Sequence, residues 1–567
     1  MNPLQVDVAG RLASVAVAAC LLATLGCSST TRADSSPYFG KAEPPEGQTL
    51  RYISGSEPES LDPQVSTGQP EARIYLALFE GLTEYHPVTG QVIPAIAERW
   101  EPNADNTEFI FHLRQNARWS NGDPITARDF VYSLRRGLSP ALAARSAYLA
   151  YYIKGAQAYN EGKGRAEDVG IEAVDDYTLK ITLATPVPYL TGLVAHQFFR
   201  LVPQKAIEKY GDAWTRPENI VTCGAFKVKT WRSYDRLIVV RDPLYWDAAT
   251  VKLDEITFYP VEDSTTMMNL YKAGEVDGVY NHTVPYAWVD ELRPLKDYMD
   301  KPENAVEYYM LNTKKPPTND LRVRRAFNMA IDKRALAVYR RVVKPLTAFT
   351  PEGIYPGYPQ PKGDPFDPQK ARELLAEAGY RDAAGNYDPS KFPIDAMEIS
   401  YNTSESNKQT AEFVQAQWKQ NLKLTVPLKN IEWKTFLDSR AKLQYSGASR
   451  AGWVGDYMDP YTFLDLFSTE TGDNGTGWSP PEYVAMLRAA NTQQDPAKRY
   501  ALLAKAEAFL LAAQPLIPLY TNATDWLKKP YVKGMYANPL TLHAWKFVYI
   551  EHDRSKWDRD DPPASTN

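Results

Sequence analysis

Residues 98–136, ERWEPNADNTEFIFHLRQNARWSNGDPITARDFVYSLRR, contain local signals for a strand, a turn and a helix. The segment 107–113 alternates apolar and polar side chains, which predicts a half-buried strand. The tetrapeptide SNGD predicts a turn in which Gly122 adopts a positive φ. Thr126 and Asp129 match a capping box, and apolar residues at helical spacing follow them. This part of the chain therefore predicts a mixed α/β fold.

The same alternation of strands and helices extends along the chain. Strands are predicted at 236–242, 254–261 and 392–402, and helices at 368–379 and 496–513. A chain of 567 residues is too long for a single core, so we expect two or three lobes.

Composition limits the classes of partner. The net charge is −5 and the chain has no long basic run, which argues against nucleic acid as a partner. The 36 tyrosines and 13 tryptophans fit either large cores or a wide, partly polar cavity, because these side chains have an apolar body and a polar tip.

The N-terminus is typical of an exported protein. An apolar run, LASVAVAACLLATLG, ends at Cys27 and is followed by a polar segment, which resembles a bacterial lipoprotein signal over residues 1–27. Cys20 is the alternative site of lipid attachment. Residues 28–47 are predicted to be a linker and 556–567 a disordered tail, since both are polar and rich in proline or glycine.

Motifs for common chemistries are missing from the sequence. It has no nucleotide-binding glycine loop, no HExxH and no CxxC, and its six histidines are scattered, so we expect no cofactor and no metal. With Cys27 lipidated, Cys223 is the only other mature cysteine, which leaves no intramolecular disulfide.

The segment SRAGWVGDYMDP, residues 449–460, poses the question of what Asp456 pairs with. Asp456 and Asp459 could form an acid–base pair, but three residues apart in an extended segment they point to opposite faces, so we expect no enzyme. Two alternatives remain, an internal bridge to Arg450 or a positive charge that arrives with a ligand.

Ordered fragments across the chain carry a family resemblance. Besides residues 98–136, these are LFEGL (78–82), IVTCGAFKVKTW (220–231), YKAGEVDGVY (271–280), NDLRVRRAFNMAIDK (319–333) and EWKTFLDSRAKLQYSGASRAGWVGDY (432–457). Together they resemble the family-5 extracellular solute-binding proteins of ABC importers, the oligopeptide-binding members in particular.

The resemblance implies a type II-like periplasmic-binding-protein fold, in which two α/β lobes joined by a hinge are accompanied by an extra α/β domain. Domain I would comprise 45–79, 204–305 and 523–555, domain II 80–203, and domain III 306–522. Ligand would be enclosed between domains I and III.

The resemblance also implies a set of ligand-binding residues. Asp456 matches the aspartate that takes the free α-amino group of a peptide, and a cleft of low dielectric would strengthen that contact. Gly68 and Gln69 match a backbone stretch that pairs with the peptide like an added strand. The other matched positions, expected around the cleft, are Trp453, Arg450, Arg440, Trp433, Arg341, Tyr280, Asn281, Asn402 and Asn407.

Several positions depart from the relatives. Ala305 and Val454 replace a disulfide, Asn407 replaces a histidine, Thr67 replaces an acidic residue, and Cys223 replaces an asparagine. Because Asn407 is uncharged, the resemblance implies a preference for peptides of about three or four residues over longer ones.

The expected function is therefore capture of short peptides in the periplasm or cell envelope. A monomeric receptor, held to a membrane by its lipid, would deliver them to an ABC permease and its ATPase subunits. A murein-peptide receptor of the same fold is the alternative within the class. A periplasmic glycosidase or peptidase is the alternative from another class.

Overall fold

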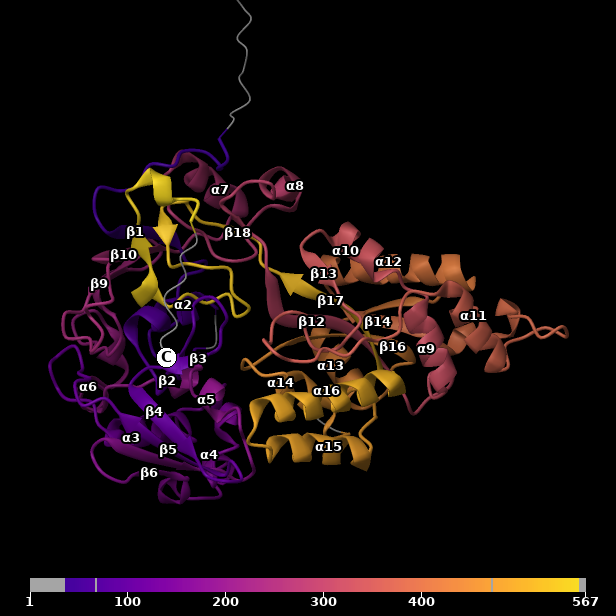
Figure 1. Ribbon diagram of the computed structural model, residues 1–567, viewed down its shortest axis with the longest axis horizontal. Helices are drawn as coiled ribbons and strands as arrows, with labels where there is room; N and C mark the ends of the chain where they lie inside the picture. The colour runs from indigo at the N-terminus through magenta and orange to yellow at the C-terminus, as the bar shows by residue number, and fades with distance from the viewer. Residues whose placement is uncertain (1–35, 67–68, 471–472, 560–567) are drawn as a thin grey trace, which may run out of the picture.

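The computed structural model describes residues 36–66, 69–470 and 473–559, and it contains three large sheets, each covered by helices (Figure 1). Two sheets lie in the left half of the view and the third forms the right half. Within the described residues, no helix is both long and apolar enough to cross a membrane.

The first sheet has the order β1-β10-β9-β8, with β1 parallel to β10 and the other pairs antiparallel. Its strands are β1 (Thr49–Ile53), β10 (Glu255–Tyr259), β9 (Arg236–Arg241) and β8 (Phe226–Arg232). Helix α2 (Gln69–Leu78) contacts this sheet through β8, and α7 (Ser264–Ala273) follows β10 in the chain. The predicted strands at 236–242 and 254–261 are therefore confirmed as β9 and β10.

The second sheet is antiparallel and has the order β4-β5-β7-β6. Its strands are β4 (Ala97–Pro102), β5 (Glu108–Leu113), β7 (Thr178–Thr182) and β6 (Ile171–Ala173), and α3 (Ala127–Gly137) packs on it. The local predictions hold here, since Gly122 has a φ of +93° and the backbone N–H of Thr126 donates to Asp129 at 2.7 Å.

The third sheet is the largest, with six strands in the order β13-β17-β12-β16-β14-β15. They are β13 (Val343–Pro345), β17 (Leu516–Ala523), β12 (Pro302–Leu311), β16 (Gly447–Val454), β14 (Glu398–Asn402) and β15 (Leu428–Ile431). Its helices are α9 (Leu321–Met329), α10 (Lys333–Arg340), α11 (Pro368–Glu377), α12 (Glu405–Leu422), α13 (Trp433–Ala441), α15 (Pro481–Asn491) and α16 (Pro496–Ala513). A separate apolar core that includes Phe327 and Trp418 lies here.

Two long strands join the halves of the molecule. β12 and β17 pair antiparallel at the centre of the third sheet, and both lead back to the first half (Figure 1). There the short strands β11 (Tyr298–Met299) and β18 (Trp526–Leu527) continue the pairing. A pair of crossing strands of this kind is a natural hinge, because few dihedral angles need to change.

Shorter elements complete the described chain. They are α4 (Ala156–Asn160), α5 (Leu190–Leu193), α6 (Gln204–Tyr210), α8 (Val289–Leu292) and α14 (Tyr461–Leu464), with the two-stranded sheets β2 (Thr83–Tyr85) with β3 (Val92–Pro94) and β19 (Val532–Lys533) with β20 (Tyr549–Ile550).

Some sequence expectations need correction. Only the second half of 392–402 is a strand, because Pro393 lacks an N–H and a 3₁₀ turn, Ile394–Ala396, follows it. The described part of the predicted linker 28–47 belongs to the fold. There the side chain of Phe39 is buried, and the Phe39 N–H donates to Asp297 at 2.9 Å.

The predicted disordered tail also begins too early. Trp557 is 6% exposed and packs edge-on against Tyr38 and Tyr531. The two ends of the described chain thus pack on each other, and a large aromatic side chain supplies enough apolar area to hold a polar segment in place.

Candidate functional site

A cavity of about 580 Å³ lies where the two halves of the molecule meet. One wall is helix α2, another is the loop at 280–282, and a third is formed by the first residues of β12 together with the turn after β16. Residues 195–197 and 539–542, with Tyr85, Arg200 and Asn522, complete the lining. The cavity therefore collects segments that are hundreds of residues apart in sequence.

Asp456 enters this cavity from the turn after β16. The preceding Gly455 is fixed by Asn304, because the Gly455 N–H donates to the Asn304 carbonyl at 2.8 Å and a Cβ at Gly455 would come within 2.3 Å of the Asn304 amide. The N–H of Asp456 donates to the Thr462 hydroxyl at 3.2 Å. The backbone is thereby held on both sides, and the carboxylate is directed into the cavity.

The electrostatic surroundings of Asp456 oppose its charge. Burial raises the pKa of Asp456 to about 6, the negative charge of Asp473 adds to the rise, and the Tyr148 hydroxyl opposes it. Within the described residues, no lysine, arginine or histidine forms an ion pair with Asp456. The predicted alternative of an internal bridge to Arg450 is therefore wrong, since the Arg450 guanidinium binds Glu307 at 2.6 Å instead.

Tyrosines bring a second lobe up to the Asp456 turn. The ring of Tyr457 stacks on Tyr189 with centroids 4.5 Å apart and an interplanar angle of 2°. Tyr461 also stacks on Tyr189, at 5.0 Å. Because Tyr189 belongs to the segment between β7 and α5, the turn that carries Asp456 is supported by both halves of the molecule.

A polar network connects the loop at 280–282 to the first residues of β12 in the cavity wall. The Asn281 amide donates to Glu303 at 2.6 Å, and a ring nitrogen of His282 lies 3.0 Å from the same carboxylate. Burial disfavours the imidazolium, but the hydrogen bond and charge of Glu303 outweigh it and raise the pKa of His282. Sequence reasoning missed Glu303, His282 and Asn304, which stand in no motif.

Of the residues expected around a ligand, the structure brings four together at the cavity. Gln69, Tyr280, Asn281 and Asp456 all line it. Gly68 lies outside the described residues, and so does the side chain of Trp433, the first residue of α13. The others belong to the second half and do not line this cavity.

Those remaining residues have partners of their own. Arg440 lies 3.7 Å from Asp473, and Arg341 forms an ion pair of 3.0 Å with Asp290. The Asn407 amide donates to Asn402 at 2.9 Å. The Trp453 indole donates to the Thr462 hydroxyl, the same oxygen that binds the backbone of Asp456.

Asp459 and Cys223, two reactive side chains of the sequence, are both buried in the fold. Asp459, the partner considered for an acid–base pair, is buried and forms an ion pair with Arg499, with Nη2 at 2.9 Å. Across residues 36–66, 69–470 and 473–559 no cluster of three histidine, cysteine or acidic side chains is placed to hold a metal. Cys223 is a buried free thiol whose sulfur accepts from the N–H of Glu80 at 3.3 Å.

Comparison with known families gives the decisive match. The model of the bacterial extracellular solute-binding proteins, family 5, matches residues 91–475, which is more than half of the chain. The chain belongs to this family. A relative, the periplasmic oligopeptide-binding protein OppA of Salmonella typhimurium, is 37% identical over 552 residues, covering 95% of this chain and 98% of OppA.

Solved structures extend the match to the fold. This family-5 chain superposes on the unliganded open form of the murein tripeptide-binding protein MppA with a TM-score of 0.82 and 34% identity, over 90% of this chain and 99% of the other. The Haemophilus influenzae OppA complex with the peptide RPPGFSPFR gives 0.67 at 33% identity, over 90% and 100%. The expected type II-like fold with an additional α/β domain is confirmed, and the arrangement of the lobes resembles an open form.

Ala305 and Val454, where the family resemblance implies a disulfide in the relatives, are neighbours in the fold. Ala305 of β12 and Val454 of β16 are register partners on adjacent antiparallel strands. They therefore stand opposite each other, as the positions of a replaced disulfide would.

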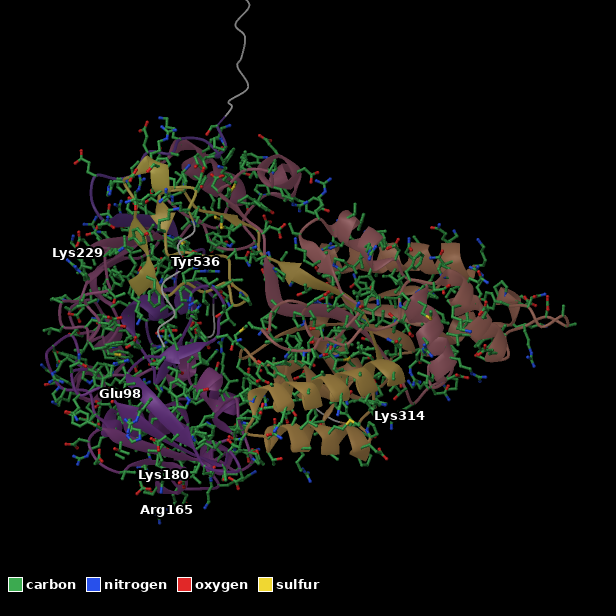
Figure 2. The ribbon with its side chains drawn as sticks, viewed as in Figure 1. Glu98, Arg165, Lys180, Lys229, Lys314 and Tyr536 are labelled. Atoms are coloured by element: carbon green, nitrogen blue, oxygen red, sulfur yellow. The ribbon has the colours of Figure 1, made fainter. Side chains whose placement is uncertain are left out.

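Charged side chains on the outer surface of this family-5 protein pair locally. Figure 2 labels Lys180, Lys229 and Lys314 at the periphery, far apart from one another. They contact Glu172 at 2.9 Å, Glu255 at 2.8 Å and Glu470 at 3.1 Å respectively.

Proposed function

We propose that this family-5 protein captures short peptides outside the cytoplasm and delivers them to an ABC permease with its ATPase subunits. The observation that supports this most directly is Asp456, a carboxylate directed into the cavity with no cationic partner among the described residues. Such a group is costly to bury unpaired, and the ammonium of a peptide N-terminus compensates that cost.

The remaining affinity would come from the peptide backbone. Gln69 at the start of α2 and the polar groups of Asn281 and Asn304 stand around the cavity, where they can hydrogen-bond main-chain amides. Recognition of this kind tolerates many side chains, because water fills the space that each one leaves. In this proposal the protein performs no chemistry on its ligand.

The test compares peptides that differ only in their N-terminus. Calorimetry with tri-alanine should show binding, and Asp456→Asn should weaken it by about 2–5 kcal/mol, because the variant strands a buried charge. N-acetylated tri-alanine should bind the wild type poorly for the same reason. Affinity should also fall as the pH drops through 6, where Asp456 becomes protonated. Equal affinity for free and acetylated peptide would refute the assignment.

A murein peptide is the second candidate ligand. The high TM-score with a protein described as a murein tripeptide-binding protein favours it, and such peptides also carry a free α-amine. Competition calorimetry of a murein tripeptide against tri-alanine separates the two. A turnover assay by mass spectrometry on both peptides would expose a peptidase or glycosidase, which this proposal does not expect.

We also propose how the receptor divides into domains and where it is located. Domain I would comprise 45–79, 204–305 and 523–555, domain II 80–203 and domain III 306–522, in a monomer that is periplasmic or anchored in the cell envelope. Cys27 or Cys20 would carry the lipid, and acyl chains contribute about 0.8 kcal/mol per buried CH₂, so two chains hold a protein firmly. Membrane fractionation of Cys27→Ala and Cys20→Ala variants identifies the anchor.

A further inference from the structure

One face of helix α2 supplies a second charge to the cavity. Gln69, Ala72, Arg73 and Leu76 all line it, which is the i, i+3, i+4, i+7 spacing of a single helix face. The charged member, Arg73, is 4% exposed. A buried arginine on a cavity wall needs an explanation, because an unpaired charge is expensive to keep out of water.

The partners of Arg73 are few. Its Nη1 donates to the Ser54 carbonyl at 2.9 Å, and its guanidinium lies 4.6 Å from the centre of the Tyr280 ring. Its Nε has no hydrogen-bond partner, and no ion pair to it is found among the described residues. Burial lowers the pKa of Arg73, and the nearby tyrosines and Glu71 oppose that fall only in part.

The other buried arginines of the described residues bind a carboxylate or several carbonyls, as Arg499 binds Asp459. Arg200 lines the same cavity, yet it binds Glu84 with two contacts, at 2.8 and 3.0 Å, and also donates to the Phe79 carbonyl. Arg324 lacks a carboxylate, but it donates to the carbonyls of four residues. Arg73 therefore stands apart in having most of its donors free.

No carboxylate near Arg73 among the described residues is available to pair with its guanidinium. Among the described residues that line the cavity, the carboxylate other than Asp456 is Glu303, which is held by Asn281 and His282. Glu84, which does not line the cavity, is held by Arg200. A guanidinium with free donors fits a carboxylate in a forked arrangement. A ligand that enters the cavity is the remaining source.

We propose that Arg73 binds a carboxylate of the captured peptide, so that this receptor favours ligands with an anionic group at a defined distance from their α-amine. This rests on the proposed peptide function. The carboxylate has two possible sources, the C-terminus of a very short peptide or an acidic side chain, and both present the same chemistry to Arg73.

The experiment uses tri-alanine, its three single-glutamate versions and the matching glutamine peptides, each with a free and an amidated C-terminus. For the wild type, one glutamate peptide should bind at least about tenfold more tightly than its glutamine twin, or the free acid tenfold more tightly than the amide. A preference for glutamate over glutamine identifies an acidic side chain as the carboxylate that Arg73 binds. A preference for the free acid over the amide identifies the C-terminus.

Two variants assign the preference to Arg73. Arg73→Met keeps the volume and removes the charge, and it should abolish the preference while leaving the thermal midpoint unchanged or higher. Arg73→Lys should keep part of it. Arg232→Met, an exposed position at the end of β8, makes the same change in net charge and should leave the preference intact.

The outcomes separate this inference from the function on which it rests. If no peptide binds the wild type, the proposed function fails. If peptides bind but Arg73→Met weakens the binding of all of them equally, the inference is overturned. It is also overturned if Arg73→Met leaves the affinity ratio of every glutamate/glutamine pair and every acid/amide pair unchanged. In either case the role of Arg73 is structural.

Discussion

At Asp456 the protein holds a carboxylate whose pKa burial raises from 3.8 to about 6. The folded state therefore binds this proton more tightly than the unfolded state does. The stabilisation that follows is complete below pH 4 and is lost as the pH rises through 6. At pH 8 the shift corresponds to about 3 kcal/mol of lost stability, which is typical of a site kept ready for a charged ligand.

The stability of Asp456→Asn tests this view of the residue. Without peptide, the variant should be more stable than the wild type by about 1–3 kcal/mol at pH 8, and the difference should shrink towards pH 4. Urea unfolding at both pH values measures it. Asp395→Asn, at an exposed position of the same half, is the control and should show no such dependence. A variant that is less stable at pH 8 would mean that an unseen partner satisfies Asp456.

At the scale of elements, α8 and α10 meet across the two halves of the molecule. Arg341, just after α10, forms an ion pair with Asp290 of α8 and lies 4.9 Å from the centre of the Tyr286 ring. The Tyr286 hydroxyl donates to the carbonyl of Tyr339 at 2.7 Å. Arg341, which the family resemblance places near the ligand cleft, thus connects the two halves in this arrangement.

Asp290→Asn should release this contact. An exposed ion pair is worth about 0.2–1 kcal/mol, so peptide affinity should rise by no more than about fivefold. Calorimetry with tri-alanine as the free acid and as the C-terminal amide shows why the affinity of Asp290→Asn rises. An equal gain for both means that closure became easier, whereas a gain confined to the free acid means that Arg341 reached the C-terminus. A loss of affinity would contradict both readings.

For the whole molecule, the better superposition on an unliganded open form than on a peptide complex predicts a closing motion. Peptide contacts to both halves would favour the closed state, and β12 and β17 would act as the hinge. Small-angle X-ray scattering should show a smaller radius of gyration after tri-alanine is added. Acetylated tri-alanine at the same concentration should leave the radius unchanged. An unchanged radius with bound peptide would mean that the halves do not move.

The sequence by itself determined the local structure and the family. The strand, turn and capping box in 98–136 form as predicted, because hydrogen bonds between near neighbours and short-range periodicity decide them. Ordered fragments identified the family and the fold. Asp456, Gln69, Tyr280 and Asn281, which the family resemblance places at the ligand cleft, all line the cavity.

Only the tertiary structure decided which charges are paired. Arg450 and Arg341 looked like ligand contacts in the sequence, yet Glu307 and Asp290 lie 143 and 51 residues away from them and neutralise them. The sequence shows only that Arg73 lies on one face of α2. That Arg73 has no carboxylate partner among the described residues depends on the residues that surround it in the fold. Whether a charge is free depends on long-range neighbours and on burial, and spacing along the chain specifies neither.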